Sequence, residues 1–258
     1  HPRVRPSWAL NTAMGAGPGV RLGLSVATRG EAARFARLGI TTARTRLPGG
    51  QRYRCTPETQ ASAGSGRPEG GGTASCSVHS GDEGATGLLA RCLAKIAGAR
   101  GGDTIFLQGE VGMGKSVFAR SFIREATGRE ALEVVSPTFL LHETYDLAGA
   151  GGAKIQHFDL YRFDSGKQLE VMLQRAYFEE CLARDIVLIE WAQYLPARYK
   201  GVERLLVSFG PGTEEGRGGE DGASRTIGLV AEGDSWSPVV EAVAGVLEQG
   251  GSESLRLL

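Results

Sequence analysis

The stretch Thr104–Ser116 reads TIFLQGEVGMGKS. Its first part, Thr104–Gln108, is a short apolar run with β-branched and aromatic residues, which is typical of a buried strand. The run leads directly into Gly109–Ser116, which fits the pattern G-x-x-x-x-G-K-[ST]. Apolar residues then recur at helical spacing through Val117–Ala126. A strand, a glycine-rich loop and a helix in this order form the context in which the pattern binds phosphates, so the sequence predicts a nucleotide site here.

The residue types of this loop suit a polyphosphate. Its glycines lack a Cβ, so the backbone can take positive φ and turn its N–H groups toward phosphate oxygens. The N-terminus of the following helix adds a field that favours anions. In this pattern Lys115 contacts the β- and γ-phosphates, and the Ser116 hydroxyl contacts Mg²⁺. The alternative is that a chain with 39 glycines produces the pattern by chance. The predicted binding residues are Gly109, Glu110, Val111, Gly112, Met113, Gly114, Lys115 and Ser116.

Two other expected strands end in acidic residues. The apolar run 186–189 precedes Glu190, and the run Lys154–Phe158 precedes Asp159. In a phosphate-binding enzyme, a carboxylate at such a position orders Mg²⁺ or polarises the attacking water. The alternatives are an ordinary charge at a strand end for Glu190 and a helix N-cap for Asp159.

Three nearby residues have open interpretations. Trp191 either stacks on a base or a partner, or packs in the core. Thr138 follows Pro137 and either reaches Mg²⁺ or the γ-phosphate, or is simply a turn residue. His157 is interpreted as a structural histidine and not as a catalyst.

The alternation of expected elements predicts an α/β fold, a three-layer P-loop NTPase-like sandwich with a central mixed β-sheet. Ligands are expected outside the carboxyl ends of its strands. The folded domain is predicted at 74–250, with a flexible insertion at 210–224 and a tail at 251–258. The remaining strands are expected at 75–79, 133–135, 140–147, 154–158, 185–190, 204–209 and 225–231, and the remaining helices at 82–99, 167–184 and 239–247.

The charge of the chain is unevenly distributed. Residues 1–57 hold ten arginines and one acidic residue, a net charge of +9. A segment rich in Arg, Ala, Ser and Thr and poor in acids is typical of a transit peptide. Residues 1–73 are therefore predicted to contain a plastid or mitochondrial targeting segment and a linker. A basic arm for RNA, a segment without a role, and a cytoplasmic location are the alternatives.

The rest of the composition narrows the class of protein. From Ala74 onward, 18 basic residues stand against 26 acidic ones, a net charge of −8 that disfavours a nucleic-acid surface. No apolar run approaches the roughly 20 residues of a membrane-spanning helix, so no membrane contact is expected. The four cysteines lie far apart without a C-x-x-C pair, which favours reduced thiols over a zinc site.

Several of these segments together resemble one family. Their order and spacing are similar to those of the bacterial-type TsaE (YjeE) proteins, over about 80–229 of this chain. That resemblance implies ATP binding and slow ATP hydrolysis with Mg²⁺, in support of N6-threonylcarbamoyladenosine formation in tRNA by a complex of TsaD and TsaB proteins. Because the net charge from Ala74 onward is −8, we expect contact with tRNA to be made by these partners. The segments are Gly109–Ser116, Ser136–Phe139, His157–Arg162, Leu169-Glu170 and Leu188–Trp191.

Carried across by position, the resemblance assigns roles to individual residues. Glu190 is the implied catalytic acid, with Lys115 on the phosphates and Trp191 beside the nucleotide. Thr138 lies in a switch-like segment, and Arg225 matches an arginine often found at the start of a late strand. The implied catalytic residues are Glu190, Lys115 and Asp159, and the implied metal-side residues are Ser116, Glu190, Asp159 and Thr138.

Some positions depart from the family pattern. Gln168 stands where an acid is usual, Leu173 replaces a common glycine, and Ala192 replaces the usual proline. We expect these changes to affect the surface that docks partners more than ATP binding. Two other functions share the phosphate loop: a small-molecule or nucleoside kinase, for which no arginine-rich lid segment follows the core strands, and a nucleotide-regulated interaction module.

Overall fold

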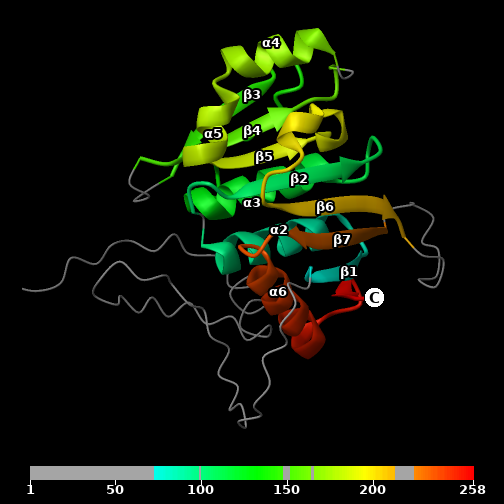
Figure 1. The fold of residues 1–258 in the computed structure, drawn as a ribbon. Helices are drawn as coiled ribbons and strands as arrows, with labels where there is room; N and C mark the ends of the chain where they lie inside the picture. Colours follow the sequence, from blue (N-terminus) through cyan, green and yellow to red (C-terminus); the bar gives the residue numbers. More distant parts are fainter. Residues whose placement is uncertain (1–72, 99, 148–151, 164–165, 213–223) are drawn as a thin grey trace, which may run out of the picture.

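The computed structural model describes residues 73–98, 100–147, 152–163, 166–212 and 224–258. These residues form one eight-stranded sheet with helices on both faces (Figure 1). The strands are β1 (Ser75–Ser80), β2 (Thr104–Gly109), β3 (His142–Asp146), β4 (Lys154–Asp159), β5 (Ile186–Glu190), β6 (Arg204–Pro211), β7 (Arg225–Glu232) and β8 (Leu255–Leu257). The helices are α2 (Glu83–Ala97), α3 (Lys115–Thr127), α4 (Lys167–Arg175), α5 (Phe178–Arg184) and α6 (Ser237–Gly250), with short 3-10 turns η1 (Ala192–Tyr194) and η2 (Ala197–Tyr199).

The sheet is mixed, in the order β3-β4-β5-β2-β6-β7-β1-β8. Strands β4, β5, β2 and β6 run parallel to one another, whereas β3, β7, β1 and β8 pair antiparallel. The predicted α/β fold with a central mixed sheet is therefore confirmed. Because parallel strands end at the same edge of a sheet, the carboxyl ends of β4, β5 and β2 lie next to one another.

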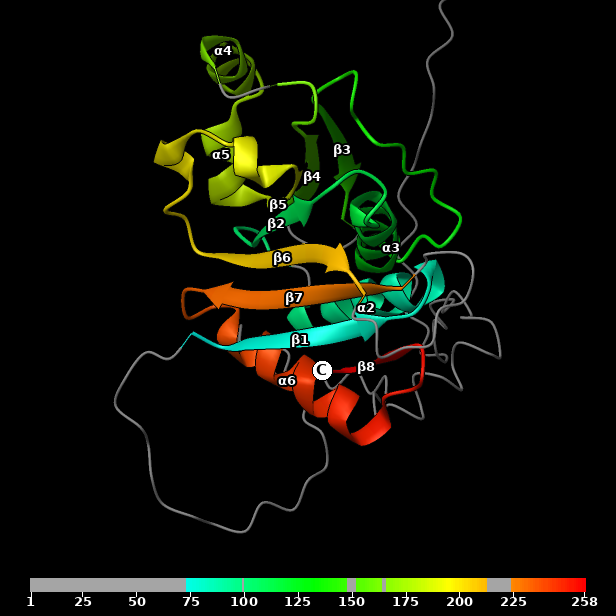
Figure 2. The same ribbon diagram turned by 90° about the vertical axis from the view of Figure 1, so that its right-hand side faces the viewer.

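Helices α2, α3 and α6 cover one face of the sheet, and the apolar side chains between them form the larger core. Helix α2 begins at Asp82, whose side chain accepts a hydrogen bond from the Ala85 N–H at 2.7 Å, and ends at Gly98 in the left-handed conformation. Helices α2 and α3 cross closely at Gly87, where a Cβ atom would lie 2.8 Å from Ser121 Oγ. Figure 2 shows α6 at the β7–β1 end of the sheet.

Helices α4 and α5 and the two 3-10 turns cover the opposite face near β4 and β5. The core on this face is aromatic: the Phe158 and Phe178 rings meet edge to face with centroids 5.0 Å apart, and Phe178 meets Tyr199 in the same way. Figure 1 shows α4 and α5 at the β3–β4–β5 end of the molecule. Strands β4 and β5 are therefore covered on both faces, because Ile155, Ile186 and Leu188 belong to the larger core and Phe158, Val187 and Ile189 belong to this one.

Two predicted elements have different bounds. The helix expected over 167–184 is two helices, because Tyr177 takes a left-handed backbone with φ of 52° between α4 and α5. The apolar spacing continues across the break, with Leu169 and Leu173 buried from α4 and Phe178 from α5, so the pattern did not reveal it. The strand expected at 140–147 begins only at His142, because Leu141 has a φ of 75°.

Two other predictions are wrong. Residues 133–135 form no strand: Val134 is buried in the core while Val135 is 51% exposed, and neither belongs to the sheet. Residues 251–258, expected as a tail, contain β8, which pairs with β1 through Leu255↔Ser80 and Leu257↔Val78. A three-residue strand is too short to show a periodic pattern, so its partner strand is what defines it.

Some predictions lie wholly or mostly outside the described residues. They are the targeting segment and linker at 1–73 and the insertion at 210–224, of which Gly210 and Pro211 belong to β6. Across the described ranges, no helix is both long and apolar enough to cross a membrane. Burial raises the pKa of the Cys76, Cys92 and Cys181 thiols to about 11, so all three stay protonated near neutral pH.

The pairing of β8 predicts a stability effect at the end of the sheet opposite β3. Leu255 is 2% exposed and packs in the larger core, whereas Leu258 is 54% exposed. Leu255→Ala is expected to lower the free energy of unfolding by about 2–5 kcal/mol, because it removes a buried side chain and leaves a cavity. Leu258→Ala, the matched control, is expected to change it by about 0.5 kcal/mol or less. Denaturant unfolding measures both, and equally small effects would mean that the segment adds nothing to the fold.

Candidate active site at the carboxyl edge of the sheet

The sheet brings the predicted acidic residues to the end of the phosphate loop. In the strand register, Glu190 of β5 lies beside Leu107 of β2 on one side and Asp159 of β4 on the other. The loop leaves β2 at Gly109, and α3 begins at Lys115. Loop, Glu190 and Asp159 therefore meet at one edge, as expected from their positions at strand ends.

Two glycines of the loop lie so close to neighbouring atoms that a side chain at either position would clash with them. At Gly109, which has a φ of 145°, a Cβ atom would lie 2.6 Å from the Phe209 carbonyl oxygen of β6. At Gly114, which has a φ of 100°, it would lie 2.7 Å from Arg225 Nη1. The loop can therefore lie close against β6 and Arg225 only with glycine at these positions. Arg225 begins β7, in agreement with its expected place at the start of a late strand, and its side chain lies next to the phosphate loop.

Lys115 is held by its own loop. Its Nζ donates to the carbonyl oxygens of Gly109 at 2.7 Å and Glu110 at 2.8 Å, and lies 3.8 Å from the centre of the Trp191 ring. The side chain is buried, and desolvation lowers its pKa although Glu190, Asp159 and Glu110 act in the opposite direction. A buried cation with only carbonyl and ring partners is well placed to exchange them for anionic oxygens.

Glu190 is a buried carboxylate with partners on both oxygens. Its Oε2 accepts a hydrogen bond from Ser116 Oγ at 2.7 Å, and its Oε1 lies 2.8 Å from His157 Nε2. Glu190 is 1% exposed and His157 is completely buried. A carboxylate this deeply buried is costly without such partners, so the pair of contacts holds the group in one orientation.

Asp159 holds the segment that precedes β3 through hydrogen bonds. Its Oδ2 accepts hydrogen bonds from Ser136 Oγ at 2.7 Å and Thr138 Oγ1 at 2.5 Å, and its Oδ1 accepts from the Tyr161 N–H at 2.9 Å. Thr138 thus contacts Asp159 directly, and the Ser116–Glu190 pair is a separate contact. Phe139, next in the chain, is 84% exposed and lies under the Arg162 guanidinium.

Trp191 packs in the core and also contacts the site. It has a left-handed backbone with φ of 60°, and it is only 7% exposed. Its ring lies between those of Tyr161 and Tyr194, with centroids 4.9 and 5.9 Å away, and against Lys115 Nζ. The core interpretation of Trp191 therefore holds, and its contact with the loop is the one with Lys115.

The oxygen donors at this edge suit Mg²⁺. This ion prefers carboxylate, hydroxyl and phosphate oxygens and is usually held by one or two protein ligands together with the nucleotide. Ser116 Oγ and a Glu190 oxygen already lie within hydrogen-bond distance of each other, so one ion could contact both side chains. Among the described residues, no group of three or more His, Cys, Asp or Glu could hold a metal alone.

Sequence reasoning did not predict the contact between His157 and Glu190. His157 lies two positions before Asp159 on the same strand, so both side chains project to one face, and that face also carries Glu190. The alternation of side chains along the strand was therefore the signal in the sequence that could have placed His157 on the same face as Asp159. The departures from the family pattern also look different in the structure: Leu173 and Ala192 are completely buried, so of the three only Gln168 lies on the surface.

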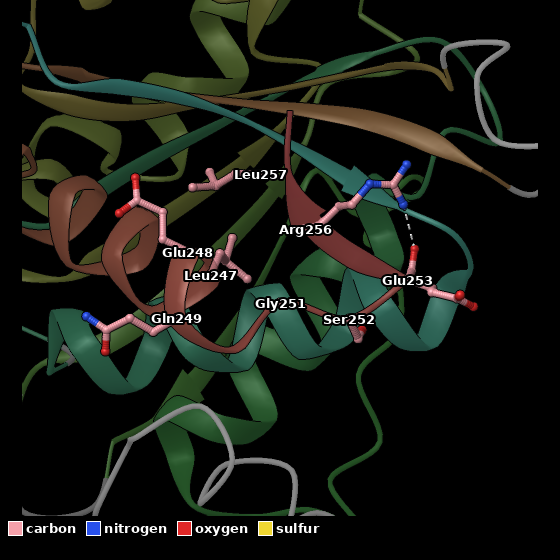
Figure 3. A pocket seen from close by; sticks show the side chains of 8 residues that line it. All are labelled: Leu247, Glu248, Gln249, Gly251, Ser252, Glu253, Arg256 and Leu257. Atoms are coloured by element: carbon pink, nitrogen blue, oxygen red, sulfur yellow. Dashed lines mark hydrogen bonds between the residues drawn. The ribbon is translucent and has the colours of Figure 1, made fainter.

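A solvent-filled hollow in the described part of the molecule lies elsewhere. It has a volume of about 570 Å³ and is open to solvent between the end of α6 and β8, with Glu248, Ser252 and Arg256 on its wall (Figure 3). None of its lining residues belongs to the phosphate loop or to the acidic edge. The converging side chains, and not the hollow, therefore define the candidate site.

Comparison with known proteins finds one family. The family model described as "Threonylcarbamoyl adenosine biosynthesis protein TsaE" matches residues 80–217, more than half of the chain. A protein named tRNA threonylcarbamoyladenosine biosynthesis protein TsaE from Rickettsia conorii is 36% identical over 110 residues, which cover 43% of this chain and 57% of that protein. Proteins of the same name from Haemophilus influenzae and a Nostoc species are 38% and 30% identical, over 34% and 42% of this chain and 51% and 64% of theirs. The chain thus spans between half and two thirds of the length of these relatives.

The contacts of Asp159 generate a prediction about the segment it holds. Asp159→Ala removes the acceptor of the Ser136 and Thr138 hydroxyls, and hydrogen bonds to a charged group stabilise by about 1.5–3 kcal/mol. Amide hydrogen exchange at Thr138–Leu141 is therefore expected to become at least about tenfold faster. Asp146→Ala is the control, because this carboxylate on β3 is 85% exposed and makes only an ion pair with Lys154. Unchanged exchange in Asp159→Ala would show that other contacts hold the segment.

Proposed function

The chain belongs to the TsaE family of threonylcarbamoyl adenosine biosynthesis proteins, and from this membership we propose that it is a Mg²⁺-dependent ATPase. In this proposal it binds ATP at Gly109–Ser116 and hydrolyses it slowly. The hydrolysis supports formation of N6-threonylcarbamoyladenosine in tRNA by TsaD-like and TsaB-like proteins. The observation that carries the proposal is the 2.7 Å contact between Ser116 of the phosphate loop and Glu190 of the neighbouring strand.

The residues of the loop bind the phosphates in this proposal. Lys115 releases the Gly109 and Glu110 carbonyl oxygens and donates to the β- and γ-phosphates, which are stronger acceptors because they are charged. The loop N–H groups and the start of α3 face the same anion. Ser116 turns its oxygen from Glu190 toward Mg²⁺. The ion, when bound, neutralises charge on the phosphate oxygens.

In this proposal Glu190 orients the water that attacks the γ-phosphate. Once Ser116 has turned away, Oε2 of Glu190 is available to orient the attacking water and to accept its proton. Glu190 is buried at the end of β5, beside Leu107 of β2, so its oxygen is held next to the loop that follows β2. Asp159 is the second carboxylate of the site, on the side of the metal.

The segment around Thr138 transmits the nucleotide state to partners. Asp159 holds it through the Thr138 hydroxyl, and a metal ion held by the same carboxylate would compete with that hydrogen bond. The segment ends in Phe139 and Leu140, which are 84% and 65% exposed, so its movement would change an apolar surface. Because the chain from Ala74 onward has a net charge of −8, we assign contact with tRNA to the partners.

The phosphate loop is tested by removing its lysine. Lys115→Ala is expected to weaken ATP binding at least about tenfold, because a charged donor to the phosphates is lost. Its fold should persist, since burial already disfavours this charge. Lys154→Ala on β4, whose side chain is 49% exposed, should bind as the unchanged protein does. Titration calorimetry measures the affinities, and an unchanged affinity of Lys115→Ala for ATP would contradict the assignment of the loop as the ATP site.

The cellular role is tested by capture of the tagged full chain from fractionated source cells. The arginine-rich residues 1–57 support import into a plastid or mitochondrion, so we expect the protein in an organelle fraction. TsaD-like and TsaB-like proteins should be recovered with it, and their recovery should change when ATP is added. Recovery of neither partner would overturn the proposed pathway, and phosphoryl transfer to a metabolite would then favour a kinase.

A further inference from the structure

His157 lies where it can control the orientation of Glu190. It is completely buried on β4, and its Nε2 is 2.8 Å from Glu190 Oε1 across the parallel pair β4–β5. A carboxylate only accepts hydrogen bonds, so Nε2 carries the proton of this contact. The imidazole thus donates to the oxygen of Glu190 that Ser116 does not contact.

Among the described residues, His157 has no hydrogen-bond partner other than Glu190. It shares its face of the sheet with Ile155 and Leu188, which belong to the larger apolar core. Within the described ranges its second ring nitrogen, Nδ1, has no hydrogen-bond partner. Burying an imidazole among apolar side chains costs free energy that a leucine or valine would not cost. The one polar contact that offsets this cost is the bond to Glu190.

The two contacts of Glu190 behave differently when the site is loaded. Ser116 belongs to the phosphate loop, and its hydroxyl leaves Oε2 when it turns to the metal. His157 belongs to the sheet, and among the described residues its hydrogen bond is to Glu190 and not to the loop, so a rearrangement of the loop does not require its bond to Oε1 to break. The carboxylate would otherwise lose its orientation at the moment when the water must be aligned.

We propose that His157 is a positioning residue: its Nε2–H anchors Oε1 of Glu190 and keeps Oε2 directed at the water during ATP hydrolysis. This rests on the proposed ATPase function. Partners that orient a group beside a metal typically contribute about 10- to 100-fold to activity, and we expect an effect of this size. Because the hydrogen bond of His157 is to Glu190 and not to the phosphate loop, the effect should fall on kcat and leave KM for ATP unchanged.

Two substitutions of similar polarity distinguish this role from simple packing. In His157→Gln, the amide nitrogen can reach about the place of Nε2 and donate to Glu190. In His157→Asn, the shorter side chain places its amide near Nδ1, where the imidazole makes no contact. We expect His157→Asn to lose roughly 10- to 100-fold in kcat and His157→Gln to recover most of it. His79→Asn is the control, since His79 is a buried histidine on β1 at the other end of the sheet.

The measurement is steady-state ATP hydrolysis with Mg²⁺ by these variants, together with their thermal unfolding midpoints. A kcat of His157→Asn equal to that of the unchanged protein would overturn the proposal. So would an equal loss of kcat in His157→Gln, or a loss that follows the unfolding midpoint, since each would show that the imidazole acts by packing alone.

A second readout does not depend on turnover. In ¹H–¹⁵N correlation spectra of nucleotide-free protein with labelled histidine, the bonded Nε2 proton of His157 should give a signal that is absent from His157→Gln. The signal should also be lost in Glu190→Ala, because the acceptor is gone. Absence of the signal from the unchanged protein, or its persistence in Glu190→Ala, would overturn the anchor. A protein that shows the bonded proton but hydrolyses no ATP would instead overturn the proposed ATPase function.

Discussion

The hydrogen bond from Ser116 Oγ to Glu190 Oε2 joins residues 74 positions apart in the chain, and the rest of the site is arranged around it. It exists because β2 and β5 are parallel neighbours, so that the loop after β2 and the last residue of β5 meet at one edge. A carboxylate that is 1% exposed must be compensated by hydrogen bonds, and Ser116 and His157 supply them from α3 and β4. The order of the strands thus determines where the Glu190 carboxylate lies, and its burial determines that it needs these hydrogen bonds.

The functional side chains of the site bond to one another and to the loop. Lys115 donates to loop carbonyls, Ser116 to Glu190, and Thr138 to Asp159. In the proposed function each contact is exchanged for one to a phosphate or the metal, so part of the binding free energy would be used to break it. The same exchange gives two alternative arrangements of one set of side chains, which is what coupling between a nucleotide and a partner surface requires.

The sequence was sufficient to predict what depends on local pattern. Strand, glycine loop and helix at 104–126, and acidic residues at the ends of β4 and β5, predicted both the fold class and the edge where the site lies. It was not sufficient where the backbone leaves its expected region. Leu141, Tyr177 and Trp191 take positive φ without being glycine, and this shortens β3, divides α4 from α5 and turns the Trp191 ring onto Lys115. Such conformations are imposed by packing between distant segments, as is the pairing of β8 with β1. The partner of His157 could be found only once β4 and β5 were known to be neighbours.

The most direct test of the central claim is a crystal structure of the full chain with Mg²⁺ and a non-hydrolysable ATP analogue. The account predicts Lys115 Nζ on the phosphate oxygens, Ser116 Oγ on the metal, and Glu190 still bonded to His157 with its other oxygen facing the γ-phosphate side. A bound analogue with Lys115 still on the Gly109 and Glu110 carbonyls and Ser116 still on Glu190 would contradict it, because the loop would then not be the phosphate site.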